Sequence, residues 1–171
     1  DWPSIASVVG KLKPSVRSPL SSVVLPERVV NNPGIPWPGQ DGGFMGRTWD
    51  PFTFECEPNA PDFRVDAFSL PKEVPPARFR NRSNLLNHID KQLQFAAGGD
   101  VLDGWTNARK QALGMLTSGP VRRAFELKRE PVAIRDSYGQ HKFGQSVLLA
   151  RRLIEAGARL VQGNFPREPG D

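Results

Sequence analysis

Cysteine is almost absent from this chain, and so are long apolar runs. The single cysteine, Cys56, excludes an internal disulfide and a zinc site built from several cysteines. No apolar run approaches the roughly 18 residues that indicate a membrane-spanning helix, and the first residues show no basic segment followed by an apolar one. We therefore expect no membrane partner, and one cysteine does not fix the compartment.

The first part of the chain also lacks an excess of positive charge. Residues 1–70 hold 6 Lys and Arg against 8 Asp and Glu, whereas residues 71–171 hold 17 against 10. Basic and acidic residues are interleaved in the second part, as in Lys128-Arg129-Glu130, and no stripe of basic and aromatic residues stands out. We interpret the excess as a solvated helical surface and expect no nucleic-acid partner. A nucleic-acid-binding face is the alternative.

Proline is scarce in the second half of the chain, because 13 of the 17 prolines precede residue 77. Residues 31–61 combine prolines with Pro-Gly and Asp-Gly turn signals. A disordered linker would not carry the large apolar side chains of this stretch. We predict a long ordered loop that packs on the body of the fold and either has a function or only covers the core. Its large apolar residues are Trp37, Phe44, Met45, Trp49, Phe52 and Phe54.

The clearest pattern lies near the end of the chain. From Phe143 onward the apolar spacing is helical, with Leu149, Leu153 and Ala156 on one face. Gly157 stands where a left-handed C-cap residue is needed, and residues 158–162 have the composition of a short strand. A helix, a glycine and a strand form half of a βαβ unit, so the sequence predicts an α/β fold. The other helical face is assigned to Arg151, Arg152 and Glu155, and Val147, Ala150 and Ile154 lie beside the apolar one.

Proline boundaries and apolar spacing predict the remaining elements. Strands are predicted for residues 20–25 and 63–70. Pro3 is assigned to the first turn of the first helix and Ser118 to the cap of the fourth. On that first helix Ile5, Val8, Val9 and Leu12 form the apolar face. The predicted helices cover residues 3–12, 78–95, 104–116, 118–130 and 132–138.

Two partial motifs do not amount to a catalytic site. Gly144-Gln145-Ser146 begins like a nucleophile elbow, but the second glycine is missing and no strand precedes it, so Ser146 is interpreted as a first-turn or capping residue. Cys56-Glu57-Pro58-Asn59-Ala60 is one residue short of the sulfatase maturation motif, because Ala60 replaces its arginine. Taken alone, the residues predict an α/β protein with no complete catalytic constellation and one conspicuous loop.

Several stretches together resemble a known family. In chain order they span essentially the whole sequence, and the last is the most specific. They resemble the uncharacterised bacterial family named domain of unknown function 1501, which is abundant in planctomycetes and related to sulfatases and alkaline phosphatases. The stretches are Asp1-Trp2-Pro3-Ser4-Ile5-Ala6-Ser7-Val8-Val9, Gly43-Phe44-Met45-Gly46, Asp50-Pro51-Phe52, Phe63-Arg64-Val65, Leu116-Thr117-Ser118, Arg123-Ala124-Phe125, Tyr138-Gly139 and residues 143–157.

The resemblance implies a three-layer α/β sandwich of alkaline-phosphatase or sulfatase type, of which residues 1–171 would be a single partial domain, an internal fragment. It implies a hydrolase of phosphate or sulfate esters that uses a divalent metal, and export of the full-length protein stays open. The Gly-Gly-Pro-Ser, Asp-Thr-Phe-Asp, Trp-Asp-Thr-His and Asp-His-Gly patterns of the family are absent from this sequence. The resemblance therefore assigns neither catalytic residues nor metal ligands here.

We predict that a small anionic ester contacts two places on this chain, the end of the last strand and the turn before the last helix together with the loop. Ligands of α/β sheets lie beyond the carboxyl ends of the strands, and a histidine in a turn between helices is either a polar residue near a ligand or a plain turn residue. An arginine in the loop would bind the anionic group through charge-assisted hydrogen bonds. The alternative is a non-catalytic binding or scaffolding protein that keeps the fold. The candidate residues are Arg47 and Asp50 in the loop, His141 and Gln145 in the turn, and Gln162 and Asn164 at the strand end.

Overall fold

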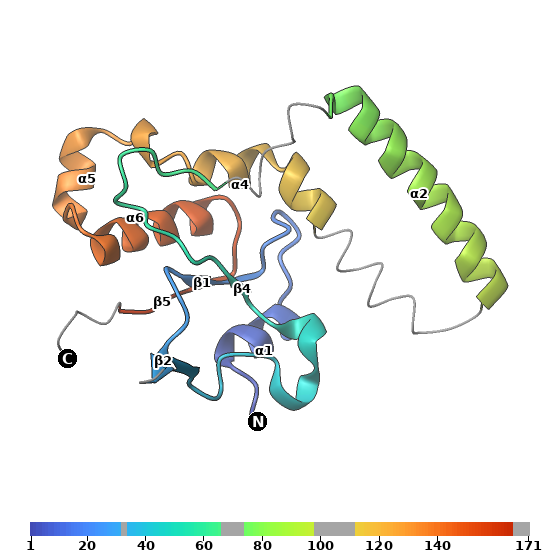
Figure 1. The fold of residues 1–171 in the computed structure, drawn as a ribbon, viewed down its shortest axis with the longest axis horizontal. Helices are drawn as coiled ribbons and strands as arrows, with labels where there is room; N and C mark the ends of the chain where they lie inside the picture. The colour runs from blue at the N-terminus through green and yellow to red at the C-terminus, as the bar shows by residue number, and fades with distance from the viewer. Residues whose placement is uncertain (32–33, 66–73, 98–111, 166–171) are drawn as a thin grey trace. The chain divides into compact units, whose positions relative to one another are not determined.

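The structure is a computed structural model that describes residues 1–31, 34–65, 74–97 and 112–165 (Figure 1). The chain divides into two compact units. The first consists of Asp1–Val65 and Ser118–Asp171, and the second of Asp66–Thr117. The first unit holds every strand of the described residues, so it is the part that positions a site.

A parallel three-stranded sheet in the order β4-β1-β5 forms the centre of the first unit. β1 (Ser22–Leu25) lies between β4 (Phe52–Thr53) and β5 (Leu160–Gly163), and Val23 is in register with residues of both neighbours. All four residues of β1 are buried, as is typical of a parallel strand covered on both faces. The mixed α/β fold and the predicted strands at residues 20–25 and 158–162 are thereby confirmed.

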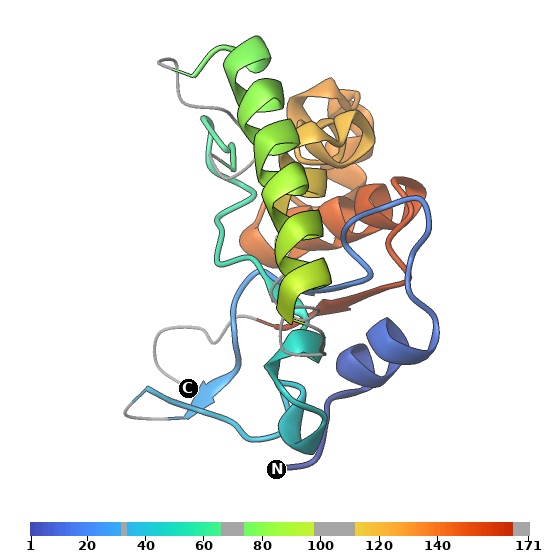
Figure 2. The same cartoon turned by 90° about the vertical axis from the view of Figure 1, so that its right-hand side faces the viewer.

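Helices cover both faces of this sheet. α4 (Gly119–Ala124), α5 (Val132–Tyr138) and α6 (Lys142–Glu155) lie on one side, and α1 (Ile5–Leu12) lies on the other (Figures 1 and 2). The predicted strand at residues 63–70 was wrong for residues 63–65, which are not in a strand, and its remainder lies outside the described residues.

α6 and its ends follow the predicted local signals. Gly157 has a φ of +104°, and a Cβ there would lie 2.9 Å from the Cβ of Arg17. Only glycine adopts that φ without strain. Arg152, which was assigned to the face of α6 opposite the apolar one, has a side chain that is only 11% exposed and pairs with Glu130. Its Nε also donates to the carbonyl of Ala124 at 2.8 Å, so this arginine fastens α6 to the end of α4.

α1 buries the face opposite to the one that its large apolar residues predict. Ala6 and Ser7 are fully buried, whereas Ile5 is 75% exposed. The small residues let the helix approach the sheet closely, because the Ser22 hydroxyl donates to the carbonyl of Ala6 at 2.6 Å. The helix begins at Ile5 with Ser4 as its cap, so Pro3 precedes the helix and does not stand in its first turn.

The predicted loop at residues 31–61 is ordered where it is described, but it is more regular than its composition suggests. It supplies β4, the third strand of the sheet, and two 3-10 turns, η1 (Gly43–Met45) and η2 (Arg47–Trp49). At the start of this loop, β2 (Val30–Asn31) and β3 (Ile35–Pro36) form a short antiparallel pair.

The helix predicted for residues 118–130 is shorter in the structure than the sequence pattern indicates. Ser118 caps it as predicted, but α4 ends at Ala124 and a 3-10 turn, η4 (Leu127–Arg129), follows. Phe125 and Leu127 are both buried. Residues two apart on a continuous helix point in nearly opposite directions, so the chain leaves the helix to bury both.

The second unit contains α2 (Pro76–Ala97), which contains the helix predicted for residues 78–95. Residues 112–117 are also helical, and the rest of the helix predicted for residues 104–116 lies outside the described residues. In the described ranges, no helix is both long enough and apolar enough to span a membrane.

Candidate functional site

The loop between β3 and β4 forms one wall of a cavity of about 390 Å³. Arg47, at the start of η2, and Asp50, directly after η2, both line it, so two of the predicted loop residues come together. The other lining residues are Arg28, Asp41 and Gly43. We refer to this space as the Arg47 cavity.

Arg28 and Asp41 form a two-pronged ion pair in this cavity. Arg28 Nη1 lies 3.0 Å from Asp41 Oδ2, and Arg28 Nη2 lies 2.5 Å from Asp41 Oδ1. The hydrogen bond that Arg28 donates to Asp41 raises the pKa of Arg28 above its ordinary value, although burial opposes the shift. Because the two charges compensate each other, this pair acts as a fixed wall and leaves little net field.

Asp50 is held by the backbone. Its Oδ1 accepts a hydrogen bond from the amide of Gly42 at 2.7 Å. A Cβ on Gly42 would collide with the carbonyl of Gly46, and Gly43 has a φ of +50°. This turn therefore requires glycine at both positions, and the turn fixes the direction of the Asp50 carboxylate.

Arg47 differs from the other charged residues of the cavity. Its side chain is exposed, and no carboxylate of the described residues lies within ion-pair distance of it. The Arg47 guanidinium is therefore the cation of this cavity that can accept an anionic partner from solution.

The polar residues at the end of β5 bond to one another and to the backbone. Gln162 Nε2 donates to Asn164 Oδ1 at 2.9 Å, and Asn164 Nδ2 donates to the carbonyl of Glu27 at 2.7 Å. Asn164 is 6% exposed, and its backbone N–H also donates to the carbonyl of Leu25. In this structure Asn164 ties the end of β5 to the segment after β1.

Beside this strand end, Lys142 lies between two carboxylates. Its Nζ lies 2.7 Å from Glu27 Oε2 and 3.6 Å from Glu57 Oε2. Burial lowers the pKa of Lys142, but the hydrogen bond and charge of Glu27, aided by Glu57, outweigh it and raise the pKa. Burial also raises the pKa of the Cys56 thiol to about 12, against a smaller opposite effect of Lys142. Cys56 therefore holds its proton at neutral pH and is a poor nucleophile.

His141 and Gln145 both act within the α5–α6 corner. His141 is the cap of α6, and its Nδ1 accepts a hydrogen bond from the amide of Gly144 at 3.2 Å. Gln145 is fully buried, and its Nε2 donates to the carbonyls of Arg135 at 2.9 Å and Gly139 at 2.7 Å. Neither residue lines the Arg47 cavity.

A family model described as a protein of unknown function (DUF1501) matches residues 1–166. The chain belongs to the DUF1501 family. The match includes the whole sheet, the Arg47 cavity and the α5–α6 corner. No curated protein and no solved structure matches the chain.

The divalent metal that the family resemblance implies does not fit the described residues of this DUF1501 chain. No group of three or more His, Cys, Asp or Glu side chains gathers in the described ranges. The carboxylates of Glu27 and Glu57 do lie near each other, but Lys142 occupies the space between them with its positive charge. We therefore assign no metal ligand.

Sequence reasoning missed Arg28, Asp41, Glu27 and Lys142 in this DUF1501 chain. Arg28 and Asp41 are 13 residues apart, and Glu27 and Lys142 are 115 apart. These residues meet only in the folded structure, and no local sequence pattern distinguishes them from other charged surface residues. The one available signal was the Asp41-Gly42-Gly43 turn, which the sequence shows only as a turn.

Proposed function

We propose that this DUF1501 domain binds the anionic group of a phosphate or sulfate ester in the Arg47 cavity, as part of a hydrolase with the three-layer fold of sulfatases and alkaline phosphatases. The observation that carries the proposal is the position of Arg47 in a concave site without a carboxylate partner among the described residues. A guanidinium presents a planar set of donors that suits two oxygens of a phosphate or sulfate group.

The neighbouring charges determine how the ligand would be oriented in the Arg47 cavity. Arg28 is already bound by Asp41, so it offers less to a ligand than Arg47 does. Asp50 repels an anion, but its Oδ2 has no hydrogen bond to a described residue and is suited to accept one from a hydroxyl group. The best ligand is therefore an ester with its anionic group at Arg47 and a hydroxyl group toward Asp50.

Neither Ser146 nor Cys56 is available as a nucleophile. Ser146 is inside α6, where its hydroxyl donates to the carbonyl of Lys142 at 2.6 Å, and the Cys56 thiol keeps its proton. We therefore expect this chain to bind esters and not to hydrolyse them by itself. The alternative function, a binding or scaffolding protein without hydrolysis, is favoured by the ion pairs and hydrogen bonds among the polar groups at the end of β5.

Isothermal titration with phenyl phosphate, phenyl sulfate and glycerol phosphate tests this proposal. Replacing Arg47 by Gln removes at least one charge-assisted hydrogen bond, worth roughly 1.5–3 kcal/mol, so the affinity should fall about 10-fold or more. Arg122→Gln, an exposed arginine of α4, is the matched control and should leave the affinity unchanged. Equal affinities of the wild type and Arg47→Gln, or no binding of any of the three esters, would refute the proposal.

Assays of 4-nitrophenyl phosphate and 4-nitrophenyl sulfate hydrolysis with added divalent metals separate the two functions. Turnover by the full-length protein that Arg47→Gln weakens supports the hydrolase. Ester binding without turnover in the full-length protein supports the binding protein.

A further inference from the structure

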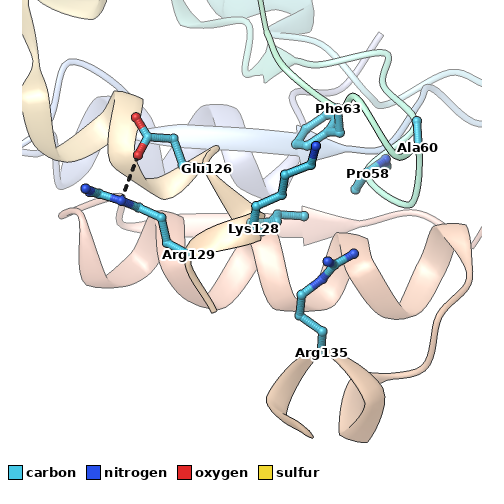
Figure 3. A pocket seen from close by; sticks show the side chains of 8 residues that line it. Pro58, Ala60, Phe63, Glu126, Lys128, Arg129 and Arg135 are labelled. Atoms are coloured by element: carbon cyan, nitrogen blue, oxygen red, sulfur yellow. Dashed lines mark ion pairs between the residues drawn. The ribbon is translucent and has the colours of Figure 1, made fainter. Parts of the chain in front are cut away.

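A second cavity of the first unit has a different character. It measures about 260 Å³ and lies between the residues that follow β4, the η4 turn and α5 (Figure 3). Pro58, Phe63 and Leu127 give it apolar walls, and Lys128 and Arg135 give it positive charge. It shares no lining residue with the Arg47 cavity, so a ligand here is independent of the proposed function.

The two cationic side chains point into the same space. Figure 3 shows the Lys128 ammonium beside Phe63 and the Arg135 guanidinium extending from α5 toward the same opening. Arg129 of the same turn points away and pairs with Glu126 at 3.1 Å. In the described ranges neither Lys128 nor Arg135 has a carboxylate partner, so the lining carries two uncompensated positive charges.

Gln145 fixes the direction of the Arg135 guanidinium. The Gln145 amide nitrogen donates to two carbonyls, so its oxygen must face Arg135, whose Nε donates to it at 3.3 Å. Gln145 is fully buried and cannot turn away. The bond occupies Nε and leaves Nη1 and Nη2 of Arg135, for which the described residues provide no partner. A guanidinium held in place in this way loses little entropy when it binds an oxyanion.

The apolar walls define the rest of the ligand. Phe63 and Ala60 are half-buried and supply the exposed apolar surface of the cavity, which favours an apolar group over water, whereas Pro58 and Leu127 are buried. The volume lies just below the roughly 300–1,000 Å³ of sites for drug-sized ligands, which suits a body of about one ring.

We propose that this cavity binds a small organic oxyanion, with its charged group between Lys128 and Arg135 and its apolar body against Phe63 and Ala60. A carboxylate, a phosphate and a sulfate share this chemistry, because each presents two oxygens to Arg135. The site requires both parts of the ligand, the charge and the apolar body.

Ligand-observed NMR and titration calorimetry with a series of one-ring probes test both parts. Benzoate, phenyl phosphate and phenyl sulfate carry the charge and the ring, benzamide carries the ring without the charge, and inorganic phosphate carries the charge without the ring. At least one of the first three should bind 10-fold or more tightly than both benzamide and inorganic phosphate. The order among the three identifies the charged group.

Variants place the binding in this cavity. Lys128→Gln and Arg135→Gln should each weaken the best probe about 10-fold, because each removes a charge-assisted bond. The double variant Arg151→Gln/Glu155→Gln removes an exposed ion pair of α6 outside the lining, leaves the net charge unchanged and should keep the affinity within about 2-fold of wild type. Lys128 is exposed, so Lys128→Gln remains informative if Arg135→Gln lowers the melting temperature.

Three results would overturn the proposal. One is equal affinity for benzoate and benzamide together with no preference for phenyl phosphate or phenyl sulfate. Another is an unchanged affinity in Lys128→Gln. The third is loss of the best probe in Arg47→Gln, which would assign it to the other cavity and count in favour of the proposed function alone.

Discussion

Gln145 and Asn164 show that a buried polar residue predicted to contact a ligand can also have a structural role. Both were selected because polar groups at a turn and at a strand end are typical of α/β binding sites. The structure bonds both to backbone carbonyls, those of Arg135 and Gly139 for Gln145 and that of Glu27 for Asn164. A sequence cannot separate these roles, because a side-chain amide suits a carbonyl of the chain as well as a ligand. Direct contact of either residue with a substrate stays a prediction.

Replacing Gln145 by Leu tests its structural role. The leucine fills a similar volume but leaves two part-buried carbonyls and Arg135 Nε without the donors and acceptor that they now have. An unsatisfied buried polar group costs roughly 1–3 kcal/mol, so the free energy of unfolding should fall by about 2–4 kcal/mol in urea titrations. Gln140→Leu, which removes only an exposed bond to Asp136, should cost less than about 1 kcal/mol. Equal costs for the two variants would argue against a structural role for Gln145.

At the scale of elements, the sequence predicted the helices whose ends are determined by residues within one turn of the chain. α5, α6 and the cap of α4 follow from Ser118, Gly139 and Gly157, because a cap or a glycine with positive φ acts within one turn of the chain. β4 was missed because two residues carry no periodicity, and Phe52 and Thr53 form a strand only by pairing with β1. The buried face of α1 was also missed, because close approach to the sheet favours small residues over large apolar ones.

Gly157 offers a test of the junction between α6 and β5. Gly157→Ala forces a Cβ to within 2.9 Å of the Arg17 Cβ at a φ of +104°. Gly39→Ala has a comparable φ of +77° but meets nothing within 4 Å, so it isolates the backbone strain. Strain of this kind costs of order 1–3 kcal/mol. In thermal or urea unfolding Gly157→Ala should be clearly more destabilising than Gly39→Ala, and a smaller effect at Gly157 would exclude a tight junction.

At the scale of the first unit, the carboxyl end of the sheet is where the topology predicted a ligand. The structure gathers charged and polar groups there, but it pairs them with one another. Lys142 of α6 joins Glu27, which follows β1, to Glu57, which follows β4, and Asn164 joins β5 to the same segment. The polar groups at this edge therefore hold three strand ends together. The unpaired cations belong to other residues, Arg47 in the loop before β4 and Lys128 and Arg135 at the cavity beside η4.

Two groups at this edge make the stability of the unit sensitive to alkaline pH. Burial raises the pKa of Cys56 from 9.0 to about 12. The pKa of Lys142 is raised above 10.5, because the bonds and charges of Glu27 and Glu57 outweigh the opposite effect of burial. A raised pKa in the folded state means that its stability contribution is complete below the unfolded pKa and is lost as the pH rises through the folded value. For Cys56 this loss spans about pH 9 to 12, and for Lys142 it begins near pH 10.5.

The free energy of unfolding should therefore fall as the pH is raised from about 9 toward 12, which urea titrations at pH 8, 10 and 11 measure. Each proton bound more tightly by the folded state adds at most about 1.4 kcal/mol per pH unit to the slope, and the partial exposure of both side chains reduces it further. Cys56→Ala should flatten the fall from pH 9 onward, and Lys142→Met should flatten only its upper part. Lys13→Met, at an exposed lysine, is the control for loss of a charge. If the free energy of unfolding of Cys56→Ala falls with pH in parallel with that of the wild type throughout, the buried thiol does not contribute to the pH dependence.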